Sequence, residues 1–182
     1  MLDEVKELTN DARRAREAMI GQLKEFSAEQ AAFKPTPESW SAVDVVEHLV
    51  LAERGGIHMM WVALEAWREG DPVWKEPHPD RDKPIEEIIA ATWQPKEQAP
   101  QVATPKLGGP LPYWLAEFTA CQGVLEALAK EMREGELDDV IYPHFLSGPL
   151  TLRQRFEFIR FHIQRHRDQI DELAANGPFP AA

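Results

Sequence analysis

The stretch that decides the fold is T-L-R-Q-R-F-E-F-I-R-F-H-I-Q-R-H-R-D-Q-I, residues 151–170. Its apolar side chains recur every three or four residues, which is the period of an amphipathic α-helix. T-L-R-Q at its start is a capping box, in which Thr151 and Gln154 each bond the other's backbone N–H. We expect the helix to reach about residue 175, because Asn-Gly-Pro at 176–178 is a stop signal.

Two histidines, His162 and His166, lie four residues apart on this helix. That spacing is about 40° of rotation and one turn of rise, so one helix can present two neighbouring metal ligands. On a helical wheel His166 falls within the apolar stripe and His162 at its edge. Two core histidines satisfied by hydrogen bonds would give the same pattern. The pair alone therefore leaves both interpretations open.

Three further segments carry the helical period, at about 2–26, 41–68 and 113–133. S-A-V-D at residues 41–44 is a variant capping box for the second of them. Glycine and proline at 70–72 end that helix, and Gly135 suits the end of the third. We therefore predict an all-α protein, with residues 1–182 forming a single domain built as an antiparallel or mixed four-helix bundle.

The long excursion at residues 70–112 is rich in proline. A short helix is expected from Pro84, since proline is well placed at a first helical position. The remainder, from Gln94 to Pro112, is expected to run over the surface. Segments of this length are lids or binding elements in some proteins and disordered in others.

Charge and composition exclude some classes of function. The formal net charge is −11, which disfavours binding to nucleic acid or to anionic membrane surfaces. No apolar run approaches the roughly 18 residues of a membrane span. Cys121 is the single cysteine, so no internal disulfide can form. We expect a cytoplasmic protein without a signal peptide.

The other histidines are less informative by themselves. His48 lies beside the apolar stripe of the second helix, where a packed, hydrogen-bonded histidine is more common than a ligand. His58, ten residues later, is expected to face outward, and His78 lies in the proline-rich excursion. His144, just before the last helix, could reach an open end of the bundle or lie on the surface.

Two segments together resemble the DinB-like (DinB/YfiT) superfamily, which is distinct from the DNA polymerase of the same name. They are W-S-A-V-D-V-V-E-H-L-V-L-A-E at 40–53 and G-P-L-T-L-R-Q-R-F-E-F-I-R-F-H-I-Q-R-H-R-D-Q-I at 148–170. The resemblance implies a four-helix bundle and a mononuclear divalent metal held by His48, His162 and His166. Such a site leaves coordination positions open, as catalytic sites do, and nitrogen ligands suit Zn, Ni, Fe or Co.

The resemblance further implies a metal-dependent enzyme, either a hydrolase or a thiol S-transferase that uses a low-molecular-weight thiol such as bacillithiol or mycothiol. Homodimers are common among such proteins. Four charged side chains are candidates to support the ligands, although each is more typical of a solvated helix surface: Glu47, Glu53, Arg165 and Asp168.

Two other interpretations remain open. One is a non-catalytic small-molecule-binding or stress-response bundle, which a site walled off by Trp40, Phe158 or the 70–112 segment would favour. The other is purely structural, with the three imidazoles buried and hydrogen-bonded to carbonyl groups.

Overall fold

The computed structural model describes residues 1–94, 98–175 and 179–180. Within these ranges, the helices between 21 and 27 residues long are α1 (Asp3–Leu23), α3 (Ala42–Arg68), α5 (Leu111–Glu131) and α7 (Leu152–Ala175). The shorter ones are α2 (Ala28–Ala32), α4 (Ile85–Thr92), α6 (Glu136–Asp139) and the 3₁₀ helix η1 (Gln101–Ala103). The described residues form no β-strand, only isolated bridges. The predicted all-α bundle is confirmed.

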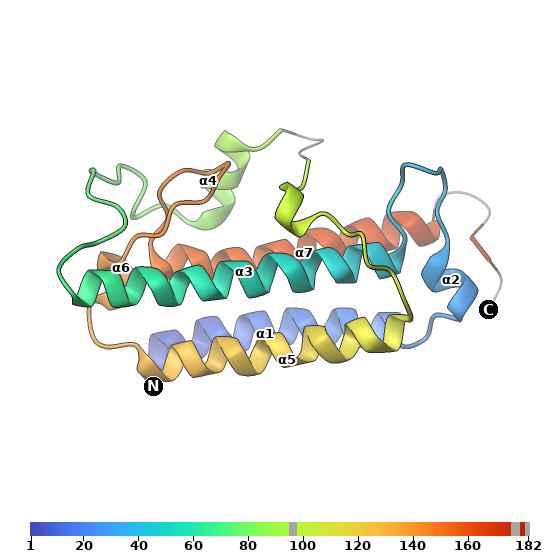
Figure 1. Cartoon of the computed structure of the whole chain (residues 1–182), viewed down its shortest axis with the longest axis horizontal. Helices are drawn as coiled ribbons and strands as arrows, with labels where there is room; N and C mark the ends of the chain where they lie inside the picture. The colour runs from blue at the N-terminus through green and yellow to red at the C-terminus, as the bar shows by residue number, and fades with distance from the viewer. Residues whose placement is uncertain (95–97, 176–178, 181–182) are drawn as a thin grey trace.

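The long helices pack in two layers, with α3 beside α7 and α1 beside α5 (Figure 1). Polar contacts between the long helices show in which direction each helix runs relative to its neighbour. Arg153 at the start of α7 bonds Glu4 at the start of α1, so these two helices are parallel. Arg54 and Arg68 of α3 bond Glu117 and the Glu131 carbonyl of α5, so these two are also parallel. The bundle is therefore mixed, with α3 antiparallel to α7.

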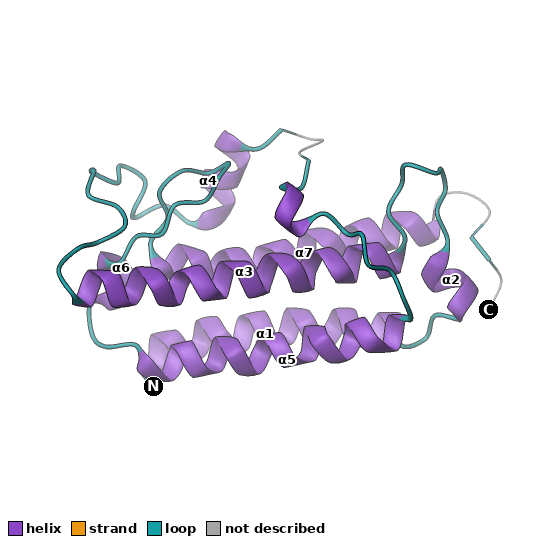
Figure 2. Ribbon diagram, in the orientation of Figure 1, coloured by secondary structure: helices purple, strands orange, loops and turns teal. Residues whose placement is uncertain are grey.

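This topology explains the long proline-rich excursion. The chain leaves α3 at one end of the bundle and must enter α5 at the other end (Figure 2). A 27-residue helix is about 40 Å long, so the connection has to cross that whole length. It does so across α3 and α7, carrying α4, which contacts α7, and η1, which contacts α3. The part of the excursion from Gln94 onward was expected to run over the surface, but Ala103 within it is buried.

The helix starts follow their capping residues. The Ser41 hydroxyl accepts a bond from the Asp44 N–H at 3.2 Å, and the Asp44 carboxylate accepts one from the Ser41 N–H at 2.8 Å. Two starts differ from the prediction. Helix α5 begins at residue 111 rather than 113, because Pro112 is tolerated in a first turn. Pro84 is the cap of α4, not its first helical residue.

Helix α2 is absent from the sequence-based prediction, which treated residues 26–40 as a break. The missed signal is S-A-E-Q at 27–30, where both bonds of a capping box form. At the other end of the chain, α7 extends to Ala175 as expected. The stop signal at 176–178 lies outside the described residues. None of the described helices combines the length and hydropathy needed to cross a bilayer.

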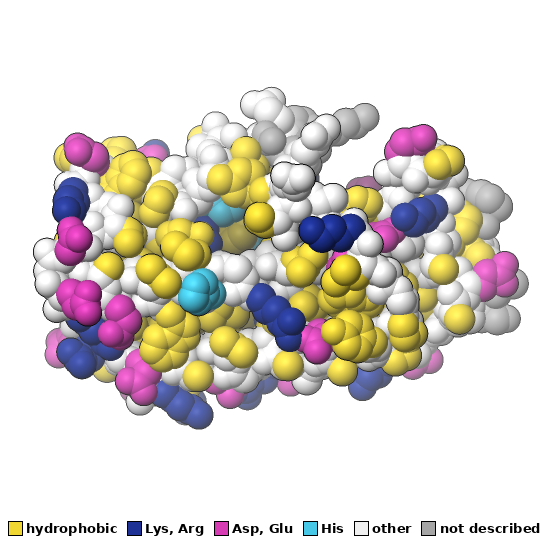
Figure 3. Space-filling model, in the orientation of Figure 1, with side chains coloured by type: hydrophobic (Ala, Val, Ile, Leu, Met, Phe, Trp, Pro, Cys, Tyr) yellow, Lys and Arg dark blue, Asp and Glu magenta, His cyan; other side chains and the backbone are white. Residues whose placement is uncertain are grey.

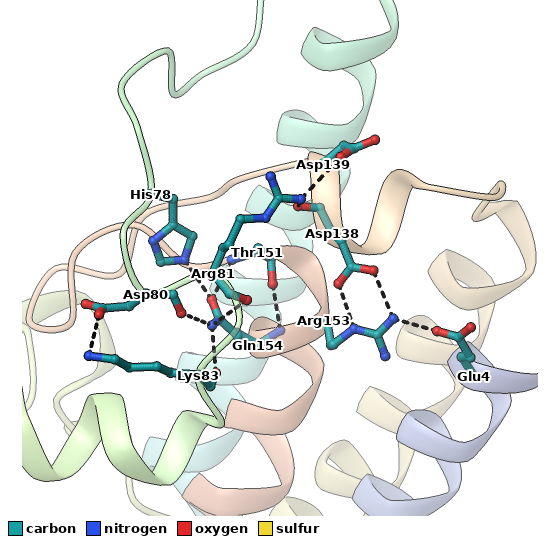
Figure 4. A network of polar contacts seen from close by, with 10 residues as sticks. All are labelled: Glu4, His78, Asp80, Arg81, Lys83, Asp138, Asp139, Thr151, Arg153 and Gln154. Carbon is teal, nitrogen blue, oxygen red and sulfur yellow. Dashed lines mark hydrogen bonds and ion pairs between the residues drawn. The ribbon is translucent and has the colours of Figure 1, made fainter.

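Gln154 ties the excursion to the start of α7 (Figure 4). Its Oε1 accepts the Thr151 N–H at 3.0 Å, which confirms the predicted capping box, and lies 2.9 Å from the Nε2 of His78. Its Nε2 lies within 2.8–3.2 Å of three carbonyl oxygens, at residues 80, 81 and 83. The side chain is 1% exposed, so one amide holds the segment that leads into α4.

Replacing Gln154 with leucine should therefore loosen residues 72–84. The substitution leaves three part-buried carbonyl groups and the buried Thr151 N–H without their amide partner, at a cost of about 1–3 kcal/mol. We expect a lower urea midpoint and faster tryptic cleavage after Arg81. Gln164→Leu, at an exposed position of the same helix, is the matched control. Unchanged cleavage in Gln154→Leu would contradict this anchoring role.

Candidate metal centre

The three histidines implied by the family resemblance lie together in the structure. The Nε2 atom of His162 is 3.2 Å from that of His48 on α3 and 3.1 Å from that of His166 one turn along α7. Ligand atoms of all three residues lie within 4.8 Å of one another. With metal–nitrogen bonds of about 2.1 Å, ligand nitrogens stand about 3.0 Å apart at 90° and about 3.4 Å apart at a tetrahedral angle. The two spacings measured from His162 fit that range.

Hydrogen bonds on the outer side of two rings decide which nitrogen carries the proton. The Nδ1 of His48 lies 2.8 Å from the carbonyl oxygen of Ala103, which can only accept. The Nδ1 of His166 lies 2.8 Å from the Oε1 of Gln169. Both rings thus carry the proton on Nδ1 and turn an Nε2 lone pair inward. The Nε2 of His162 carries at most one proton, so it can donate a hydrogen bond to only one of the other two rings. At least two Nε2 lone pairs of the group therefore face each other, as in a site shaped for a cation.

Neither supporting group was among the four candidates named from the sequence. A backbone carbonyl such as that of Ala103 has no sequence signature. Gln169 does have one, because it lies three residues after His166 and therefore on the same side of the helix. Arg165 and Asp168 are exposed, as is typical of helix-surface charges.

Glu47 and Glu53 are not surface charges, so the preference for solvated positions was wrong for both. Glu47 is fully buried, and its carboxylate accepts the backbone N–H groups of residues 106, 107 and 108 at 2.7–2.8 Å. It thereby fixes the excursion beside η1. Glu53 is 4% exposed and pairs with Arg16 in the bundle core. Neither carboxylate contacts an imidazole.

The imidazoles are enclosed. They are between 4% and 8% exposed. The Trp40 ring lies 4.9 Å from the ring of His48, and Phe158 stacks on His162 at 5.2 Å. Ala103 of the excursion completes the cover. Figure 3 shows a recess between α3 and this segment, with histidine and cationic atoms at its bottom. Trp40, Phe158 and the 70–112 segment thus all contribute to the enclosure, the feature named above as favouring a non-catalytic binding protein.

The remaining histidines lie apart from this group. His58 is exposed, as expected, and His78 bonds Gln154. His144 is buried rather than on the surface, with its ring 4.7 Å from that of Phe158 and 5.7 Å from that of Trp93. Its Nδ1 accepts the N–H groups of Leu146 and Ser147 at 3.2 and 3.3 Å.

Burial lowers the pKa of all four enclosed histidines, because removal from water disfavours the charged imidazolium. The pKa of His144 and of His166 falls to about 3, that of His48 is lowered, and that of His162 lies well below its usual value. Neutral imidazole is the form that binds metal. At neutral pH no proton has to leave these rings first.

These shifts predict how the metal-free protein responds to acid. Folded pKa values below the unfolded value of about 6.5 mean that the unfolded chain binds more protons, so stability falls as pH drops from 6.5 toward 3. Each of the four histidines changes the free energy of unfolding by up to about 1.4 kcal/mol per pH unit. Urea unfolding of the wild type between pH 6.5 and 5 should show this dependence of stability on pH. The slope should be smaller in His144→Phe and the same as wild type in His58→Ala. Equal slopes in all three proteins would contradict the assignment.

A cavity lies elsewhere, at the end of the bundle. Its volume is about 620 Å³, and apolar residues from α1, α2 and α5 form most of its lining, with Leu23, Ala31 and Leu115 among them. It contains none of the three histidines. The cavity offers shape and mainly apolar surface, with Lys24, Ser27 and Thr119 as the polar side chains of its lining.

Comparisons with known proteins agree with this fold. The chain is 28% identical over 155 residues to the uncharacterized protein YuaE of Bacillus subtilis (strain 168), covering 84% of this chain and 88% of that protein. A crystal structure of a conserved protein from Enterococcus faecalis superposes with a TM-score of 0.57 at 14% identity, covering 95% and 96% of the two chains. Residues 11–170 match the DinB superfamily. The chain therefore belongs to the DinB superfamily.

Proposed function

We propose that this protein is a metal-dependent enzyme that uses His48, His162 and His166 as the metal ligands and acts on a small molecule. The convergence of the three Nε2 atoms carries the proposal. A divalent ion bound there would lower the pKa of a water or thiol substrate toward neutrality. Zn, Ni, Fe and Co all suit three nitrogen ligands.

The protein's own residues orient and shield the site. The Ala103 carbonyl and Gln169 hold His48 and His166 in the tautomer that turns Nε2 inward. Trp40 and Phe158 exclude water from the ring faces. Both nearby glutamates are already occupied, Glu47 by three N–H groups and Glu53 by Arg16. One carboxylate oxygen of Glu53 has no partner among the described residues, but neither glutamate is hydrogen-bonded to one of the three imidazoles.

This supports thiol transfer over hydrolysis. Attack by water commonly depends on a positioned general base, whereas a thiol becomes nucleophilic once its proton is lost. We therefore favour an S-transferase that joins a low-molecular-weight thiol to an electrophile. The test compares metal-loaded protein with His162→Ala in two assays, conjugation of bacillithiol or mycothiol to 1-chloro-2,4-dinitrobenzene and hydrolysis of p-nitrophenyl acetate. Conjugation lost with His162 supports transfer, and ester cleavage lost with His162 supports hydrolysis instead.

A non-catalytic binding protein is the second candidate, favoured by the enclosure of the imidazoles and by the apolar cavity at the bundle end. The two candidates differ in whether the cover opens. Glu47→Gln weakens the hold on residues 106–108 and should speed the loss of bound metal to a chelator severalfold if the segment is a lid. Activity absent in both assays together with unchanged metal loss would favour the binding protein.

A further inference from the structure

Arg155 of α7 is a buried cation with no anionic partner among the described residues. Its side chain is 6% exposed, and its Nε and Nη1 have no hydrogen-bond partner among the described residues. Ring faces surround it, with its Cζ 4.2 Å from the Tyr142 centroid and 5.7 Å from that of Phe158. Burial lowers the pKa of Arg155 to about 10. A desolvated charge without a counter-ion is unfavourable, so this guanidinium is prepared to receive an anion.

The position of Arg155 relates it to the metal centre. It lies seven residues before His162, which is two turns on the same face of the helix and about 10.5 Å of rise. Across the groove, Gly56 lies eight residues after His48, and a Cβ at that position would lie 3.4 Å from the Nη2 of Arg155. Because α3 and α7 are antiparallel, His48 and His162 face each other at one level and Gly56 and Arg155 face each other two turns away.

Aromatic side chains connect the two levels. Phe158 stacks on the His162 ring at 5.2 Å and lies against the Arg155 guanidinium. His144 packs on the same phenyl ring at 4.7 Å. Since the Nδ1 of His144 accepts two backbone N–H groups, its proton is on Nε2, and the ring offers a neutral donor. Along the facing sides of α3 and α7 there is therefore a cation at one level, three imidazoles two turns away and the Phe158 ring between them.

We propose that Arg155 binds the carboxylate of an elongated substrate or thiol cosubstrate whose other end reaches the three histidines. This inference rests on the proposed function of the histidine site and names the chemical class of its ligand. A single guanidinium balances one negative charge. A phosphate dianion would leave a second charge unpaired among aromatic side chains, which is unfavourable at low dielectric. The ligand is thus a monoanionic carboxylic acid with an apolar body.

The test uses two probes that differ only at the end that meets Arg155. One is 8-mercaptooctanoate, whose extended chain matches the two-turn separation of about 10.5 Å, and the other is 8-mercapto-1-octanol. Calorimetry measures both affinities for Co(II)-loaded and for metal-free protein. We expect the wild type to prefer the acid by about tenfold or more in both forms, as a charge-assisted hydrogen bond would provide.

Two neutral variants, Arg155→Met and Arg155→Gln, should bring the acid-to-alcohol ratio below about twofold while alcohol binding stays the same. Arg167→Met, which removes an exposed cation from the same helix, should keep the full ratio. Arg155→Met should also unfold at the same or a higher urea concentration, because it removes an unpaired buried charge. A purely structural arginine would instead give a less stable variant with an unchanged ratio.

The outcomes separate the two proposals. Wild-type protein that binds Co(II) but shows no acid preference would overturn the role of Arg155 and leave the metal centre standing. An acid preference that survives in both neutral variants would also overturn it. If Co(II) does not bind while the metal-free protein shows an Arg155-dependent preference, the carboxylate site is upheld and the metal-dependent function fails.

Discussion

His162→Ala is expected to abolish stoichiometric metal binding while leaving the bundle folded. His162 lies at the centre of the group, with its Nε2 3.1–3.2 Å from those of His166 and His48. Loss of a supporting hydrogen bond at a metal site typically costs 10- to 100-fold in affinity, and loss of a ligand should cost more. Metal content after dialysis, measured by elemental analysis, and titration with Co(II) check this.

The stability of the same proteins gives a second readout. A ligand that binds the folded state at one hundred times its dissociation constant adds about 2.7 kcal/mol to the free energy of unfolding. Metal should therefore raise the melting temperature of the wild type and of His58→Ala, the exposed-histidine control on α3. It should not raise that of His162→Ala. A metal-dependent shift of equal size in all three proteins would mean that the ion binds elsewhere.

The largest stability effect is expected at the buried pair Arg16–Glu53. The two side chains are 2% and 4% exposed and join α1 to α3, while Arg16 also donates to Gln122 of α5. Glu53→Gln leaves the guanidinium without a counter-charge, and breaking a buried pair in this way costs about 3–5 kcal/mol. Urea unfolding at pH 8, where Glu53 is mainly charged, measures the cost. Glu117→Gln, which breaks the exposed pair with Arg54, should cost at most about 1 kcal/mol.

The loss of stability on replacing Arg16, the other member of the pair, should depend on pH. Burial raises the pKa of Glu53 to about 7 even beside Arg16, and Arg16→Met removes the charge that opposes this rise. A folded pKa above the unfolded value means that stability is lost as pH increases. Arg16→Met should therefore be less destabilised at pH 5.5, where Glu53 binds a proton, than at pH 8. Similar losses for Glu117→Gln and Glu53→Gln, or a pH-independent Arg16→Met, would contradict a buried ion pair.

The long helices were predictable because period and capping residues are local. The Ser41 and Thr151 capping boxes form as the sequence indicates. The order of packing was not predictable. Whether α3 lies parallel or antiparallel to α5 depends on contacts such as Arg68–Glu131, which are far apart in sequence and have no local signature. The path of residues 70–112 follows from that choice.

The histidine group was predictable mainly through the family resemblance, since spacing on α7 supplied only two of its members. The burial of Glu47 could not be foreseen, because its partners are backbone N–H groups of an irregular segment. Arg155 did carry a signal. It lies seven residues before His162, within the apolar stripe of the helix, where a solvated charge is not expected.

The most direct measurement is anomalous X-ray diffraction from crystals of untagged protein loaded with one equivalent of Zn²⁺ or Co²⁺. A three-histidine centre requires a single ion with the Nε2 atoms of His48, His162 and His166 each about 2.0–2.1 Å away. An ion at another position, or His48 turned away from an ion held only by the α7 pair, would contradict it.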